Sequence, residues 1–155
     1  MKEPKTRQNI ESAFAGESMA YMKYMYFAKV CRAQGDDATA QVFEETAAQE
    51  IHHAFGHLDL LYPADTLSAA ICLEKAIEGE TYEYTEMYPG FRKQAEIERD
   101  EAAIAEIDEQ ITESKEHAAR FQATLVKAAK RFAALAKVEE RHANHYREQL
   151  NRVKA

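Results

Sequence analysis

Four stretches of this 155-residue sequence each carry one glutamate inside an apolar stripe of helical period. The stripes cover residues 10–28, 43–61, 73–91 and 132–150, and their glutamates are Glu17, Glu50, Glu80 and Glu139. A carboxylate in an apolar core costs several kcal/mol, on the order of 3–5, unless a positive partner compensates it. No lysine or arginine occupies the stripe positions. The pattern therefore predicts four helices around a shared cation.

Composition agrees with an all-α chain. Five glycines and three prolines are few, and helix-forming residues dominate. The net charge of -7 argues against a nucleic-acid partner, because such proteins depend on clustered lysine and arginine. Cys31 and Cys72 form no C-x-x-C pair, and no apolar run is long enough for a membrane helix. We expect a reduced, cytoplasmic protein with a single domain over residues 1–155.

The chain also contains an internal repeat. The sequence GES at 16–18 returns as GET at 79–81, and the Glu-x-x-His motif at 50–53 returns at 139–142. Two hairpins with equivalent glutamates predict an antiparallel four-helix bundle with a pseudo-twofold axis. Pro89, inside the third stripe, predicts a kink in that helix.

The two copies differ in length. Glu17 precedes Glu50 by 33 residues, whereas Glu80 precedes Glu139 by 59, so the second hairpin carries an insertion at about 98–124. If Glu80 and Glu139 lie at one height, the second hairpin turns near residues 109–113, with Thr112 or Ser114 as helix cap, and projects about 20 Å beyond the first. A turn at Arg99–Asp100 is the alternative. A straight return helix then reaches the height of Glu80 near Ser114 and leaves Glu139 far beyond.

Paired Glu-x-x-His motifs with one glutamate from each of two further helices form the ligand set of two-metal helix bundles. The six residues are Glu17, Glu50, His53, Glu80, Glu139 and His142. An oxygen-rich set with one nitrogen per metal and no thiolate favours iron or manganese over zinc. Glu83, on the same stripe as Glu80, has no counterpart in the first copy and is expected to serve one metal only. Glu113 and His117 fall beside the apolar stripe of their segment, and we interpret them as a solvated face.

Four segments carry a resemblance to a known family: GESMAYMKYMYFA, ETAAQEIHHAFGHLD, AIEGETYEYTEMYPGF and FAALAKVEERHANHY. They resemble the ligand-bearing helices of rubrerythrin, the ferritin-like di-iron peroxidase family. The resemblance implies that Glu17 binds one iron, which exchanges Glu83 for His53 when its oxidation state changes. It also implies that Glu80 and His142 bind the other iron, that Glu50 and Glu139 bridge, and that Tyr24 and Tyr88 are the tyrosines near the site.

By this resemblance the chain is expected to reduce hydrogen peroxide to water, with two iron ions that are oxo- or hydroxo-bridged when oxidised. Full-length rubrerythrins add a rubredoxin-like domain with two C-x-x-C pairs, which this sequence lacks. Electrons are therefore expected from a separate rubredoxin or rubredoxin-like donor, and the protein is expected to be a homodimer. The alternative is a ferroxidase that handles iron as ferritins do. The residues alone leave peroxide and oxygen open as oxidants.

Overall fold

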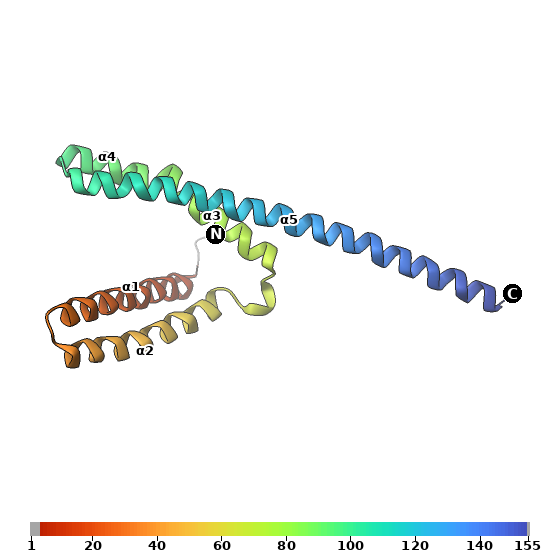
Figure 1. Ribbon diagram of the computed structural model, residues 1–155, viewed down its shortest axis with the longest axis horizontal. Coiled ribbons are helices and arrows are strands. Elements are labelled where there is room, and N and C mark those ends of the chain that lie inside the picture. The colour runs from red at the N-terminus through yellow and green to blue at the C-terminus, as the bar shows by residue number, and fades with distance from the viewer. Residues whose placement is uncertain (1–3, 155) are drawn as a thin grey trace. The chain divides into compact units, whose positions relative to one another are not determined.

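The computed structural model describes residues 4–154, which form helices joined by short turns (Figure 1). The helices are α1 (Lys5–Ala33), α2 (Asp37–Leu61), the 3-10 turn η1 (Ala64–Thr66), α3 (Ala69–Tyr82), the π-turn η2 (Glu83–Met87), α4 (Tyr88–Glu98) and α5 (Glu101–Lys154). No strand occurs among the described residues, so the all-α prediction is confirmed. The expected domain bounds of 1–155 reach past these residues at both ends. The helices form two compact units that divide between Leu67 and Ser68.

The first unit is the hairpin of α1 and α2. Gly35 makes the turn with φ +83°, a left-handed conformation that glycine adopts without steric cost, and the Asp36 side chain then caps α2 by accepting a hydrogen bond from the backbone N–H of Thr39 at 3.0 Å. Arg32 of α1 ties the helices together through Glu44 of α2. The seam uses buried residues at heptad spacing on α2, three of which are alanines. These buried residues are Ala40, Ala47, Ala54 and Leu61.

The second unit pairs α3, η2 and α4 with the first part of α5. Arg99 adopts the left-handed conformation with φ 60°, and the Asp100 side chain accepts a hydrogen bond from the backbone N–H of Ala103 at 3.0 Å. Arg92 of α4 joins Asp108 of α5 at 2.5 Å. The turn thus repeats the chemistry of the first hairpin, with a left-handed residue followed by an aspartate cap.

The expected turn near residues 109–113 is wrong, because α5 runs unbroken through that segment. Thr112 and Ser114, the expected caps, both lie inside the helix. The Thr112 hydroxyl bonds to the carbonyl oxygen of Asp108, one turn earlier, and Ser114 bonds across to Glu83. The alternative turn at Arg99–Asp100 is confirmed. Residues 98–124 therefore form this turn and the first part of the return helix, with no projecting extension.

The π-turn η2 interrupts regular helical bonding between α3 and α4, just before Pro89. Proline has no backbone N–H to donate to the preceding turn, so the interruption falls where the sequence predicts a kink. The π-turn also places one extra residue in the segment that runs from α3 through α4 to the turn at Arg99. Glu80 accordingly lies one residue farther from Arg99 than Glu17 lies from Gly35. Such turns are frequent at functional sites.

Helix α5 continues past the start of α3 (Figure 1). We call residues 126–154 the C-terminal arm. Near its base, Ala128 and Leu135 line a cavity together with Ala69, the first residue of α3. Among the described helices, none has both the length and the apolar character required to cross a membrane.

Candidate metal centre

Glu17, Glu50 and His53 form the first ligand group, within the α1–α2 hairpin. One potential ligand atom from each of the three lies within 4.8 Å of the others. His53 Nδ1 is 3.1 Å from Glu50 Oε2 and 3.9 Å from Glu17 Oε1. The i, i+3 spacing places Glu50 and His53 on one face of α2, and that face meets Glu17 of α1. The first half of the predicted ligand set is therefore brought together.

The carboxylates of the first ligand group are crowded. The hydrogen bond between the Glu17 and Glu50 side chains raises the pKa of Glu17, and burial and the negative charge of Glu50 add to the rise. A carboxyl group behaves in this way where a like charge has no cation to balance it. A metal cation would supply that balance. Two carboxylates and one imidazole, without a thiolate, suit iron.

Glu80, Glu83, Ser114 and His117 form a second cluster, between the α3–η2 segment and α5. His117 Nδ1 lies 3.5 Å from Glu80 Oε1. The Ser114 hydroxyl, 3% exposed, donates a hydrogen bond to Glu83 Oε2 at 2.9 Å. The second cluster thus consists of two contacts between the helices, Glu80 with His117 and Glu83 with the buried Ser114.

Position relative to the two turns shows which residues of the return helices are equivalent. Ser114 follows Arg99 at the same sequence distance at which Glu50 follows Gly35. His117 likewise follows Arg99 as His53 follows Gly35. The second hairpin therefore has the histidine of a Glu-x-x-His motif, but a serine occupies the position of its glutamate.

The interpretation of His117 as a solvated residue is wrong, because its side chain is half-buried against Glu80. Glu113 is exposed in the second unit, as predicted. The sequence contained a signal for His117, since a count from the alternative turn at Arg99 places it where His53 stands in the first hairpin.

Glu139 and His142 lie on the C-terminal arm, and both are exposed. Glu139 is 25 residues after Ser114 on one continuous helix, which is about 37 Å at 1.5 Å per residue. The prediction that they join Glu80 depended on a turn near residues 109–113. Without that turn, α5 cannot bring them to Glu80 of the same chain.

The two predicted tyrosines lie in aromatic pairs. Tyr24 packs against Phe43 of α2 with ring centroids 5.9 Å apart, and Tyr88 packs edge-on against Phe91 at 6.2 Å. Burial raises the pKa of Tyr88, and the negative charge of Glu83 adds to this effect. The Tyr88 phenol therefore stays protonated near the second cluster and can donate its proton to a hydrogen bond.

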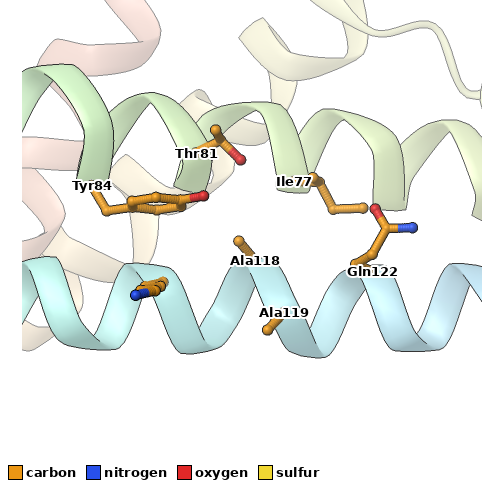
Figure 2. A pocket seen from close by; sticks show the side chains of 7 residues that line it. Ile77, Thr81, Tyr84, Ala118, Ala119 and Gln122 are labelled. Carbon is orange, nitrogen blue, oxygen red and sulfur yellow. The ribbon is translucent and has the colours of Figure 1, made fainter.

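A groove between α3 and α5 adjoins the second cluster (Figure 2). Its volume is about 380 Å³, and Thr81, Tyr84 and Gln122 line it with polar atoms. Figure 2 shows Tyr84 across the gap from α5, where Ala118 and Ala119 leave room. Four lining residues, Thr81, Tyr84, Lys115 and Ala118, each directly follow a member of the second cluster in the sequence. A small polar molecule in this groove would therefore lie close to that cluster.

A family model described as Rubrerythrin matches residues 8–63 and 59–125. A rubrerythrin of Porphyromonas gingivalis is 37% identical over 137 residues, covering 81% of this chain and 68% of its own. A nigerythrin of Nitratidesulfovibrio vulgaris is 32% identical and a rubrerythrin of that organism 36% identical, over 76% and 70% of this chain and 64% and 66% of theirs. A solved nigerythrin in a mixed-valence state aligns with a TM-score of 0.40 at 30% identity, over 83% of this chain and 70% of that one. The chain spans about two thirds of the length of these curated relatives.

Proposed function

Because this chain belongs to the Rubrerythrin family, we propose that it reduces hydrogen peroxide to water with electrons from a rubredoxin-type protein. Family membership makes it a ferritin-like di-iron oxidoreductase of the rubrerythrin kind. Peroxide as oxidant, rubredoxin as donor and a homodimer are our proposals. The observation that carries the iron chemistry is the first ligand group, where Glu17, Glu50 and His53 come within 4.8 Å.

Two irons need more ligands than the first hairpin contains, so we assign residues of both hairpins to them. Glu139 and His142 remain predicted ligands only if another molecule of the chain supplies them. The assigned ligands are Glu17, Glu50, His53, Glu80, Glu83 and His117.

Glu113 is not among the assigned ligands, because it is exposed as the sequence predicts, and because Ser114 occupies the position on α5 that corresponds to Glu50.

Bound ferrous irons would supply the two electrons that cleave the O–O bond, so that one peroxide, two electrons and two protons give two waters. The protein residues bind the ions, exclude competing ligands and position protons. The Ser114 hydroxyl donates a hydrogen bond to Glu83 Oε2, so we propose that a bound iron competes with Ser114 for this carboxylate. His53, the most exposed of the first ligand group, is the residue whose coordination we propose to alternate with that of Glu83.

The oxidant is tested by anaerobic stopped-flow mixing of the ferrous protein with peroxide and, separately, with oxygen. A peroxidase oxidises at least ten times faster with peroxide, whereas a ferroxidase reacts faster with oxygen. Glu50→Ala serves as the impaired variant, and the exposed Glu116→Ala is its matched control. A faster reaction with oxygen would replace our proposal with the iron-handling alternative. Equal rates for Glu50→Ala and the wild type would remove the first ligand group from the reaction.

A further inference from the structure

The C-terminal arm carries an apolar stripe that is open to solvent. Its large residues are Phe132, Leu135, Tyr146 and Leu150, which are 66%, 58%, 72% and 53% exposed. Their spacing of three, eleven and four residues keeps them on one side of α5. Four large apolar side chains in one row on an arm about 43 Å long are more than a monomer ordinarily exposes.

Among the described residues of the second unit, no helix covers this stripe. Helix α3 begins at Ala69, beside the base of the arm. From Phe91 to the last residue there is no glycine or proline, so nothing in the sequence signals a break that would fold the arm back on α5. A second copy of the chain offers the matching surface, because the stripe is complementary to itself.

We propose that the arms of two copies pack antiparallel about a twofold axis that passes between Glu140 and Arg141. In such an isologous contact, residue i faces residue j and j faces i. A register in which the two numbers sum to about 281 places Leu135 opposite the partner's Tyr146, and Phe132 opposite the partner's Leu150. The apolar residues of one arm thus meet those of the other over the whole stripe.

The same register explains the two polar residues of the stripe. Glu139 faces the partner's His142, and His142 faces the partner's Glu139, since their numbers also sum to 281. A carboxylate and an imidazole form a hydrogen-bonded pair, so each polar group enters the seam with a partner. The basic side chains Lys137 and Arg141 lie on the opposite side of the helix and stay in solvent.

A cavity at the base of the arm can accept the C-terminal end of the partner's arm. A cavity of about 290 Å³ lies there, lined by Ala69, Ala128, Arg131, Phe132 and Leu135. The antiparallel register brings the partner's Leu150 opposite Phe132, at the edge of this cavity. The contact therefore extends from the tip of each arm to the α3–α5 junction of the other copy.

Disulfide trapping tests the register. In a full-length Cys31→Ser, Cys72→Ser background, one chain carries Leu135→Cys and another carries Tyr146→Cys. After mixing and mild oxidation, we expect a covalent heterodimer of the two. Neither chain should crosslink with itself, because identical positions lie 11 residues, about 16 Å, apart along the seam, beyond the reach of a disulfide. Self-crosslinking of either chain would overturn the antiparallel register, and absence of any crosslink would overturn the pairing of the arms.

The mass of the full chain in solution tests the surface independently. The wild type is expected to be a dimer by light scattering, Leu135→Asp a monomer, and Ala133→Asp, on the opposite side of the arm, a dimer with the same added charge. A monomeric wild type, or a dimeric Leu135→Asp, would refute the proposal. This inference deepens the proposed homodimer, but Leu135→Asp should keep the iron content of the wild type. Iron binding and dimer formation can therefore fail separately.

Discussion

The Ser114 hydroxyl donates a hydrogen bond to Glu83 Oε2 at 2.9 Å, from the helix position that corresponds to Glu50 when both are counted from their turns. The two halves of this repeat therefore differ chemically at this position. At that position the first half has a carboxylate, and the second has a hydroxyl that holds the carboxylate of the facing π-turn.

Replacing Ser114 should show what this hydroxyl contributes. Ser114→Ala removes the partner of Glu83 and is expected to lower the stability of the metal-free protein by about 1 kcal/mol, since Glu83 is half-exposed. Ser114→Glu adds a third carboxylate beside Glu80 and Glu83, so the metal-free protein should melt earlier and gain more from ferrous iron than the wild type. Melting temperatures with and without anaerobic iron measure both effects. An equal gain with iron in Ser114→Glu and wild type would show that this position does not face the metal.

His117 and Glu139 compete for the role of ligand, and alanine variants decide between them. His117→Ala is expected to lose about one of the two irons per chain, because its imidazole lies beside Glu80. Glu139→Ala should keep both irons unless a second copy donates this residue. Iron analysis after anaerobic loading gives the result, with Glu116→Ala as the exposed control. Loss of iron in Glu139→Ala alone would restore the original six-residue set.

Local patterns in the sequence are sufficient to predict the fold class and the first ligand group. Helical period identifies the stripes, and Gly35 followed by Asp36 marks the first turn, so the three residues of the first ligand group come out correctly placed. The second turn was harder to predict because Arg99 carries no glycine signal. Its left-handed conformation goes with the hydrogen bond that the Asp100 backbone N–H donates to the Ala95 carbonyl oxygen and with the cap that Asp100 provides for α5.

The position of the second turn controlled the rest of the site prediction. The segment 139–142 repeats the Glu-x-x-His motif fully, whereas Glu113 and His117 stand four residues apart instead of three. A comparison of motifs therefore selects Glu139 and His142, although the unbroken helix α5 places both residues far from Glu80. The π-turn also shifts the count by one residue. The sequence distance from a correctly placed turn therefore predicts which residues lie beside Glu80 better than the identity of the motif does.

The ion pair between Arg92 and Asp108 predicts a pH dependence of stability. Hydrogen bonding to Arg92 lowers the pKa of Asp108 below its ordinary value of 3.8. A lowered folded-state pKa contributes stability above the unfolded-state value, and this contribution is lost as the pH falls through the folded-state pKa. The difference in unfolding free energy between wild type and Asp108→Asn should stay constant from about pH 8 to 5 and shrink below about pH 4. Urea titrations across this range measure it, and a difference that grows in acid would contradict the assignment.

At both turns glycine is expected to be the more stable residue, because both positions have a left-handed backbone conformation. Arg99→Gly relieves a left-handed conformation that costs an L residue about 1–2 kcal/mol, less the entropy that glycine adds to the unfolded chain, so a net gain of about 0.5–1 kcal/mol is expected. Gly35→Ala should lose about 1 kcal/mol for the converse reason. Thermal unfolding of both variants, with Gly90→Ala in helix α4 as a control where helix propensity favours alanine, tests the symmetry. Destabilisation by Arg99→Gly would mean that the arginine side chain contributes more than its backbone strain costs.

Glu83→Ala should keep about two irons and impair the oxidised state. The other assigned ligands of both hairpins remain to bind the ions, but the loss of one anionic ligand destabilises the ferric form more than the ferrous form. The reduction potential of one iron should therefore rise, and peroxide turnover should fall at least tenfold. Potentiometric titration and stopped-flow kinetics measure the two effects. Ser114→Ala is the matched control, since it leaves the Glu83 carboxylate in place and removes only its hydrogen-bond partner. An unchanged potential with full turnover in Glu83→Ala would show that Glu83 is a half-buried neighbour of Ser114, and the exchange between Glu83 and His53 would have no part in the reaction of this chain.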